Sequence, residues 1–307
     1  MEAAGSDLAS PVSTAGPVDR LLLAALAVLG VLVCAFDPRP WRLLALYAAL
    51  ALCLWAACRL APRSRAGDAF HAFAPLVVII GIFQSVGFVV AVANRARWDG
   101  YFAALDRRIF GRLSPAWHGF LGRPAWLTDL LSLCYVSYYV IPVAMAVALY
   151  VRARRDEFDR LAFGLQATLL ASFAGYFFFP TAGPRVPPGQ AAAVLGGGRV
   201  SAGVRWFLHA CEMNPLDAFP SGHTAVALVF LAYGWRMFPR WRLALALAAA
   251  GIVFSTVYLS HHYVVDLAAG ALVAVAVLAA APWLQRAFGA RGEAGAVTKL
   301  DTLGRIG

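Results

Sequence analysis

Charged side chains are scarce in this sequence, and lysine is almost missing. Only 14% of the 307 residues are charged, whereas 61% are hydrophobic, and Lys299 is the single lysine. Soluble domains carry about 25% charged residues. The low share of charge therefore argues against a soluble globular protein and favours one with many membrane-spanning segments.

Nucleic-acid binding is also disfavoured, although the formal net charge is +10. Nearly all of the positive charge comes from arginine, and no basic stripe with interleaved aromatic residues occurs outside the connections between apolar segments. Basic residues of membrane proteins collect in cytoplasmic loops. We therefore expect no nucleic-acid partner.

Motifs for metal binding and redox chemistry are missing as well. None of the five cysteines forms a CxxC pair, and four of them lie within apolar stretches. They are interpreted as small buried apolar side chains. Zinc bound by His223, His261, His262 and Asp266 is a rival interpretation of those residues. Without HExxH or a close His-x-His pair, however, the sequence predicts no metal and no cofactor.

Long apolar segments are what the sequence has in abundance. A run of about 20 apolar residues can cross a bilayer as a helix. The sequence therefore predicts an all-α polytopic membrane protein with about eight transmembrane helices. The predicted spans are Leu21–Phe36, Trp41–Leu60, Ala69–Ala93, Trp126–Val151, Leu161–Phe179, His223–Phe238, Leu243–Leu259 and Val264–Trp283.

Composition divides the chain into four parts. Residues 1–19 are rich in Ala, Ser, Gly and Pro and lack a positive n-region, so we expect a disordered tail and not a cleaved signal peptide. Residues 20–66 hold two spans as a membrane hairpin, and residues 67–285 hold the other six. Residues 286–307 are polar and are expected to form a mobile C-terminal tail.

Two connections stand out by their pattern. Residues 94–125 predict a helix lying in the membrane interface, because apolar residues recur at helical spacing opposite charged ones. Residues 180–220 form a long polar connection, an outer loop of a length that is usually either functional or disordered.

The distribution of arginine predicts the orientation in the membrane. Eight spans place both termini on one side, and the short basic loops lie on that side, so the termini should be cytoplasmic. Three polar motifs then reach the opposite, outer face: Pro180–Arg185, Ser221–His223 and His262–Asp266. The arginine- and alanine-rich composition suggests a bacterial protein, which would place it in the plasma membrane with an outward-facing site.

The stretch Phe219–Thr224 predicts a phosphate-binding helix start. Ser221 is a good N-cap, and Gly222 allows a ligand to approach the backbone. The free N–H groups and the positive end of the helix dipole favour an anion. His223 would lie in the first turn, beside that anion.

A second motif supplies a nucleophile. His262 and Asp266 are four residues apart and share a helix face. The carboxylate can hold one ring nitrogen while the other attacks phosphorus. We predict a two-step displacement in which His223 is the general acid and base, and Arg185 with the backbone at Ser221 and Gly222 binds the phosphate oxygens.

With these motifs assembled, the sequence resembles the type 2 phosphatidic acid phosphatase superfamily, and within it the inositol phosphorylceramide synthase-like branch. Pro220–His223 is the second family signature, and Ser255, Thr256, His262 and Asp266 follow the third with Thr256 in place of an arginine. Phe179–Arg185 stands where the first signature belongs. The resemblance implies that residues 67–285 form a catalytic domain with a six-helix core and that no metal is needed. It also implies that His262 is the nucleophile, Asp266 its partner and His223 the acid.

Three functions are consistent with these observations. The first is transfer of a phosphoryl or phospho-headgroup between a membrane lipid and an alcohol such as inositol. The second is hydrolysis of a lipid phosphate or polyprenyl diphosphate, which differs in whether water reaches the phosphohistidine. The third is a transporter or scaffold, for which polar residues at mid-membrane depth are too few. The oligomeric state is left open.

Overall fold

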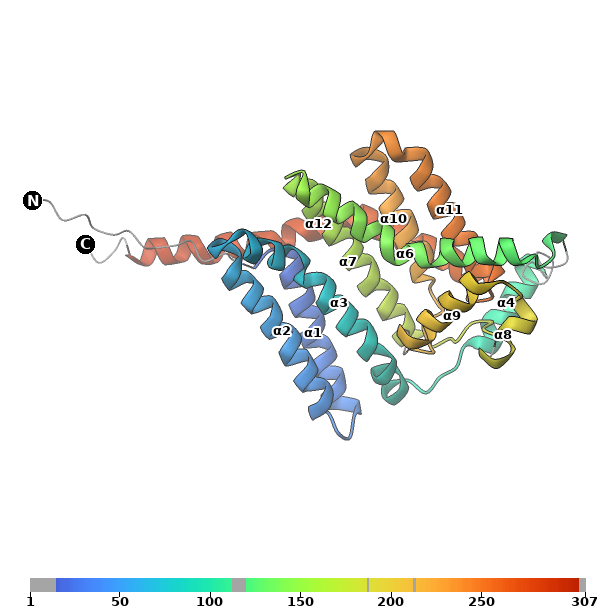
Figure 1. Cartoon of the computed structure of the whole chain (residues 1–307). Coiled ribbons are helices and arrows are strands. Elements are labelled where there is room, and N and C mark those ends of the chain that lie inside the picture. Colours follow the sequence, from blue (N-terminus) through green and yellow to red (C-terminus); the bar gives the residue numbers. More distant parts are fainter. Residues whose placement is uncertain (1–14, 112–119, 187, 212–213, 304–307) are drawn as a thin grey trace, which may run out of the picture.

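The computed structural model describes residues 15–111, 120–186, 188–211 and 214–303. Within these ranges the chain is helical, and its one β pairing is an isolated bridge between Thr181 and Asp217. Long helices pack side by side as a bundle, and short ones gather at one end of it (Figure 1). The predicted all-α membrane fold is confirmed.

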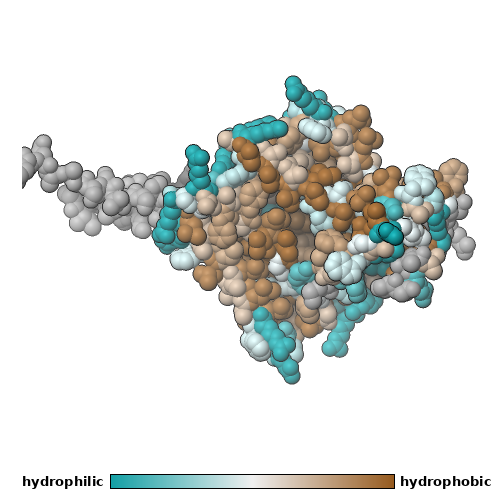
Figure 2. Space-filling model, in the orientation of Figure 1, coloured by the Kyte–Doolittle hydropathy of each residue, from teal (hydrophilic) through white to brown (hydrophobic). Residues whose placement is uncertain are grey.

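Seven helices in the described part of the chain are long and apolar enough to cross a membrane. Apolar residues cover much of the bundle in Figure 2, with hydrophilic residues toward its edges. The 3-10 turns Ala61–Arg63 and Pro239–Trp241 extend α2 and precede α11. The seven helices are α1 (Pro17–Phe36), α2 (Trp41–Leu60), α3 (Arg65–Ala93), α6 (Ala125–Val151), α7 (Arg155–Phe178), α11 (Arg242–Tyr258) and α12 (Val264–Leu303).

The sixth predicted span, His223–Phe238, is a helix, but a shorter one. Helix α10 (Gly222–Met237) has 16 residues, which corresponds to about 24 Å, whereas the hydrocarbon core of a bilayer is about 30 Å thick. It packs against α7, α11 and α12, and more than half of its residues are buried. The bundle therefore consists of seven full-length spans around one short, enclosed helix.

The first two helices form a hairpin that packs on α3. Leu22, Leu54 and Val78 belong to the buried cluster that joins the three helices. Val31 and Leu52 on the outer surface of the hairpin are 69% and 60% exposed, as expected for residues that face lipid. The helices correspond to the hairpin predicted over residues 20–66, although α1 begins at Pro17 and α3 already at Arg65.

The structure of the chain ends differs from the sequence predictions. Helix α1 begins at Pro17, inside the segment 1–19 predicted to be disordered, and residues 1–14 lie outside the described ranges. Helix α12 continues to Leu303, whereas we expected a mobile tail from residue 286. The prediction ended the helix at the last apolar residue. The helix continues because the residues that follow include Ala, Arg, Glu and Leu, which have high helix propensity whether they are polar or apolar.

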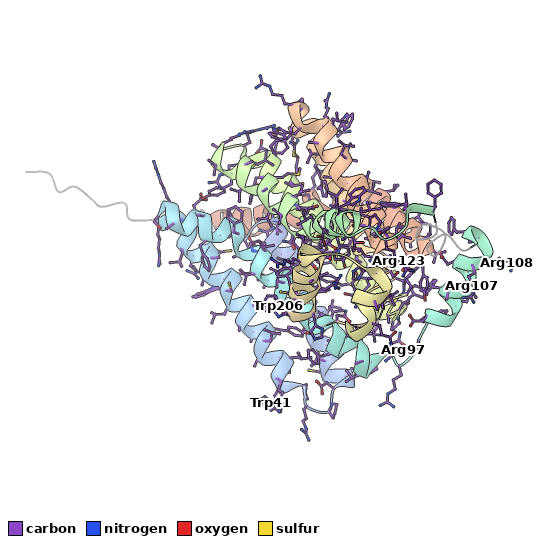
Figure 3. All side chains as sticks on the ribbon, turned by 45° about the vertical axis from the view of Figure 1, so that its right-hand side comes forward. Trp41, Arg97, Arg107, Arg108, Arg123 and Trp206 are labelled. Carbon is purple, nitrogen blue, oxygen red and sulfur yellow. The ribbon has the colours of Figure 1, made fainter. Side chains whose placement is uncertain are left out.

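The predicted interfacial helix corresponds in part to α4 (Asp99–Phe110), while residues 112–119 lie outside the described ranges. Arg107 and Arg108 are exposed at the outer edge of this helix (Figure 3). Asp106, however, is buried, although it lies on the charged side of the helix. The reason is that this carboxylate hydrogen-bonds to the backbone of α12, as described below.

The connection over residues 180–220, which we predicted as an outer loop, is partly helical. It contains α8 (Pro188–Leu195) and α9 (Arg199–Cys211), and residues 187, 212 and 213 lie outside the described ranges. The N–H groups of Gly198 and Ser201 donate to Asp129 Oδ1 of α6 at 2.8 and 2.9 Å. A carboxylate from another helix thus caps the start of α9, a contact that short-range patterns do not reveal.

Candidate active site

Three segments that are distant in sequence meet at one end of the bundle. Their backbones are joined directly: Ala218 N–H donates to the Thr181 carbonyl, and Ser221 N–H donates to the Asp266 carbonyl, both at 2.9 Å. The connection after α7, the start of α10 and the start of α12 are therefore neighbours. We call this end of the molecule the active-site face.

Two glycines allow this close approach. A Cβ at Gly175 of α7 would lie 2.1 Å from Pro220 Cδ, and a Cβ at Gly270 of α12 would lie 2.4 Å from the Ser221 carbonyl oxygen. No side chain fits at either position without moving the backbone. The helices on both sides thus clamp the residues that precede α10.

Helix α10 begins as the sequence predicts. Ser221 is the N-cap, and its hydroxyl accepts a hydrogen bond from Thr224 N–H at 3.2 Å. Ser221 and Gly222 are buried. The N–H groups predicted to bind phosphate already have protein partners, however: that of Ser221 donates to the Asp266 carbonyl, and the backbone of Gly222 hydrogen-bonds to Tyr176. What this buried turn offers an anion is the positive end of the helix dipole.

His262 is held in one tautomer by its surroundings. Its Nδ1 lies 2.9 Å from the Ala218 carbonyl oxygen and 3.4 Å from Asp266 Oδ2. A carbonyl oxygen only accepts hydrogen bonds, so Nδ1 carries the proton. In the neutral ring Nε2 then has its lone pair free, which is the state that a nucleophile requires.

Asp266 is placed to support the positive charge that forms on this ring. It is fully buried, and its Oδ2 also accepts the backbone N–H of Tyr263 at 2.8 Å. This bond fixes the carboxylate across the first turn of α12. The i to i+4 pairing predicted from the sequence is present, and Asp266 is the nearest carboxylate to the imidazole of His262.

His223 faces His262 across the site. The two ring centroids are 5.7 Å apart. Tyr138 and Tyr135 of α6 pack against the His223 ring, with centroid distances of 4.2 and 4.4 Å. Within the described residues, the buried Nε2 atom of His223 has no hydrogen-bond partner. A buried, unsatisfied ring nitrogen beside a second histidine is what an enzyme needs where a substrate proton is to be exchanged.

Arg185 lies at the same site and contacts a residue that the sequence analysis missed. Its guanidinium forms an ion pair with Asp217, which is largely buried. Asp217 lies two residues before Phe219, where the stretch Phe219–Thr224 begins. This proximity was the one feature of the sequence that could have identified Asp217 as a residue of the site. Of the described residues that line the cavity at this site, Arg185 is the one cation apart from the histidines.

Two acidic residues of α4 support the site from outside, and the sequence analysis missed this role too. Asp99 Oδ1 accepts the N–H groups of Ala182 and Gly183 at 2.9 and 3.0 Å, and Asp106 Oδ1 accepts the N–H of Val265 at 2.9 Å. These bonds connect α4 to two of the three converging segments. The acidic side of α4 therefore orders the site.

His261 is a neighbour of the site and not a second nucleophile. Its ring stacks on Tyr135 with a centroid distance of 4.5 Å. Burial lowers the pKa of His261 to about 3, with smaller contributions from Arg185 and His262. His261 is therefore neutral at physiological pH. The carbonyl of Thr256 holds the backbone N–H groups of His261 and His262 at 2.8 and 3.2 Å.

An apolar cavity of about 280 Å³ leads away from the histidines between α3, α6 and α7. His223, His262, Arg185 and Asp217 line its polar end. Most of the remaining lining is aliphatic or aromatic, for example Leu76, Ile79, Phe83, Val143, Leu165 and Leu169. The cavity therefore has the shape and polarity for a molecule with an apolar chain and an anionic head.

The model of the PAP2 superfamily matches residues 100–280, more than half of the chain. The chain belongs to the PAP2 superfamily. The match begins in α4 and ends in α12, so it includes the histidines, Asp266 and Arg185. The PAP2 match starts after α3, later than the boundary at residue 67 that we expected.

Individual relatives agree with this assignment. The phosphoinositol dihydroceramide synthase of Bacteroides thetaiotaomicron is 28% identical over 151 residues, 44% of this chain and 49% of the relative. A PA-phosphatase related-family protein of Dictyostelium discoideum is 23% identical over 236 residues, 65% of this chain and 42% of the relative. The inositol phosphorylceramide synthase of Candida albicans is 37% identical over 60 residues, 20% of this chain and 13% of the relative.

The chain thus matches about half or less of the length of these relatives. No solved structure was found that matches it. The family and the relatives support an enzyme of the membrane lipid phosphatase or phosphotransferase type, and the resemblance to the synthase-like PAP2 branch is confirmed.

Proposed function

We propose that this PAP2 protein transfers a phosphoryl group or phospho-headgroup from a membrane lipid to an alcohol through a phosphohistidine on His262. The observation that carries the proposal is the buried pair of imidazoles. His262 has its Nδ1 proton held by Ala218, and His223 has an unpartnered Nε2 beside it. One ring is prepared for attack and the other for proton transfer.

In the first step, Nε2 of His262 attacks phosphorus, and the bond from phosphorus to the leaving oxygen breaks. Protonated His223 donates its proton to that oxygen. Burial and the neighbouring His262 lower the pKa of His223, so it is the negative charge of the bound phosphate that would favour its cationic form. Asp266 stabilises the positive charge on the phosphorylated imidazole.

In the second step, His223 takes the proton of the acceptor hydroxyl, whose oxygen displaces His262 from phosphorus. The acceptor gains the phosphate-bearing group, and both histidines return to their starting states. Arg185 and the positive end of the α10 dipole stabilise the non-bridging oxygens in both steps. A guanidinium has five donors, so Arg185 can contact Asp217 and phosphate together.

A lipid is the proposed donor because the cavity at the histidines is apolar along most of its length. The names of two relatives describe synthases of lipids in which a ceramide carries an inositol phosphate headgroup. We therefore propose an inositol-containing phospholipid as donor and either inositol or the hydroxyl of a ceramide-type lipid as acceptor. We also propose that the protein lies in the bacterial plasma membrane with its active-site face outward.

Hydrolysis of a lipid phosphate is the second candidate, favoured by the relative related to PA-phosphatases. The chemistry differs in the second step alone, where water replaces the alcohol. The N–H bonds to Asp99 and Asp129 order the connection over residues 180–220, which supports exclusion of water and hence transfer.

The test uses the purified full-length protein in mixed micelles with a donor lipid labelled in phosphorus, and with inositol or ceramide as acceptor. With an inositol-containing donor, transfer to ceramide yields a labelled new lipid and transfer to inositol yields a labelled diinositol phosphate, whereas hydrolysis yields labelled inositol phosphate without any acceptor. Omitting the acceptor should trap label on the protein.

His262→Asn should trap no label, because its amide can keep the bond to Ala218 but has no ring nitrogen for attack. His209→Asn on the exposed surface of α9 is the control. Full turnover by His262→Asn would exclude the proposed intermediate, whereas wild-type protein that converts no donor would favour a transporter or scaffold.

A further inference from the structure

A second group of reactive side chains lies at the end of the bundle opposite the active-site face. Asp19 is in the first turn of α1, Cys58 in the last turn of α2, and His71 in the second turn of α3. We call this end the N-terminal face. From His71 to the end of α3 at Ala93 is about 33 Å of helix. The group therefore has no part in the proposed phosphate chemistry.

The donor atoms of these residues converge on one point. His71 Nε2 lies 2.9 Å from Asp19 Oδ2 and 3.5 Å from Cys58 Sγ, and Cys58 Sγ lies 3.7 Å from Asp19 Oδ2. All of the donor atoms lie within 4.8 Å of one another, and this is the one such group of three in the described part of the chain. One nitrogen, one sulfur and one oxygen donor together suit a borderline-soft divalent ion.

We propose that Asp19, Cys58 and His71 bind a zinc ion that fastens the α1–α2 hairpin to α3. With the usual bond lengths, a tetrahedral zinc ion spaces sulfur and nitrogen or sulfur and oxygen ligands about 3.5 Å apart, and nitrogen and oxygen about 3.3 Å apart. The two sulfur distances, 3.5 and 3.7 Å, already match. The separation of His71 and Asp19 has to grow from 2.9 Å by about 0.4 Å.

Burial also fits a metal site. Asp19 is 3% and Cys58 is 8% exposed, whereas the His71 side chain is 23% exposed. Two ligands are thus shielded, and the third borders an opening through which an ion can enter and where water can be the fourth ligand. On binding, the thiol of Cys58 loses its proton to solvent, and His71 binds as a neutral ring.

The ligands come from three different helices, so the ion would act as a cross-link. Close to Asp19, the guanidinium of Arg20 donates to the carbonyls of Phe288 and Gly289 at 2.6 and 2.9 Å, which joins α1 to α12. The N-terminal face is therefore where the hairpin meets the C-terminal half of α12. All three ligands precede residue 100, where the PAP2 match begins. The proposed zinc site therefore lies outside the part of the chain that matches the PAP2 superfamily, and it does not depend on the proposed function.

The alternative is a hydrogen-bonded cluster without metal. Asp19 Oδ2 also accepts the N–H of Gly16 at 2.7 Å, so the carboxylate has protein partners in either case. The two states differ in whether the Cys58 sulfur is a thiolate bound to an ion. Cobalt(II) reports this directly, because a thiolate ligand gives it an intense charge-transfer band that nitrogen and oxygen ligands do not.

The experiment measures metal content and the cobalt spectrum of the full-length protein in detergent. Wild type should hold about one zinc ion per chain after dialysis, and Cys58→Ser should hold at least about tenfold less at the same free zinc. Cys53→Ser, on the same helix but outside the group, is the matched control and should bind as wild type. Zinc should raise the Tm of wild type and of Cys53→Ser, but not that of Cys58→Ser.

Wild-type protein that binds less than about one tenth of an equivalent of zinc, and gives no thiolate band with cobalt, would overturn the proposal and leave a hydrogen-bonded cluster. Equal binding by wild type and Cys58→Ser would do the same. If Cys58→Ser does not fold, the cobalt spectrum of wild type decides whether the Cys58 thiolate binds the metal. Asp19→Asn should then weaken zinc and cobalt binding while the thiolate band persists.

Discussion

At the scale of single residues, the site depends on a division of labour between two histidines in different surroundings. His262 is buried against a carbonyl and a carboxylate, whereas His223 is packed between tyrosine rings. The first environment fixes a tautomer, and the second keeps a ring nitrogen available. Identical side chains thus receive different roles from their neighbours.

Asp266→Asn should lower kcat by about 10²–10⁴-fold with little change in KM, because an amide cannot stabilise the cationic phosphoimidazole. The Asn side-chain oxygen can still accept the N–H of Tyr263, so the turn should fold. Steady-state kinetics with the labelled donor measure the effect. A kcat within twofold of wild type would mean that Asp266 has no electrostatic role.

His261 should make the fold less stable in acid. The pKa of His261 is about 3 in the folded protein, below the usual 6.5. Between these values the unfolded chain binds a proton that the folded chain does not, so stability falls as pH drops from 6.5 toward 3. Melting in detergent at pH 7 and pH 5 should show a smaller acid-induced loss of Tm for His261→Gln than for wild type. An equal loss in both would show that His261 is not the group responsible.

At the scale of elements, the short helix α10 is positioned by what lies on either side of it. Gly175 of α7 and Gly270 of α12 admit Pro220 and Ser221, and the ring of Phe102 of α4 stacks on Phe219 at 4.0 Å. The motif therefore depends on three elements that a linear pattern does not connect.

Gly175→Ala should destabilise the protein by about 1–3 kcal/mol, because the new methyl group overlaps the Pro220 ring and overpacking has this effect. It should also lower kcat, since α10 carries His223. Gly203→Ala in α9 is the control: a Cβ there meets no atom within 4 Å. Thermal melting and kinetics of both variants give the comparison. Equal Tm and kcat for the two would contradict the proposed clamp.

At the scale of the whole molecule, the chain separates two chemical sites onto opposite ends of a membrane bundle. The histidines lie at the active-site face, and the Asp19–Cys58–His71 group lies at the N-terminal face. The basic loops after α2, α6 and α10 share the N-terminal face with that group. Their positive charge predicts that this face is cytoplasmic.

A fluorescent protein fused to the C-terminus should therefore fluoresce in bacterial cells, because it folds in the cytoplasm. A cysteine introduced at Arg199, at the start of α9, should react with a membrane-impermeant maleimide in intact cells. The chain should first be freed of its exposed thiols, Cys34 and Cys211, so that the label reports the new site. A dark fusion together with an unreactive cysteine would reverse the proposed orientation.

The sequence by itself determined the helical membrane fold and the residues of the proposed reaction. Apolar run length fixes the spans, and the spacings in Pro220–His223 and His262–Asp266 fix local geometry, since both depend on near neighbours in the chain. Only the tertiary structure decided the partners of those residues: Asp217 beside Arg185, Ala218 beside His262, and Asp99 and Asp106 beneath the site. It also brought together Asp19, Cys58 and His71, which no spacing or motif in the sequence groups. Contacts between distant segments depend on how helices pack, and helix periodicity carries no record of which helices become neighbours.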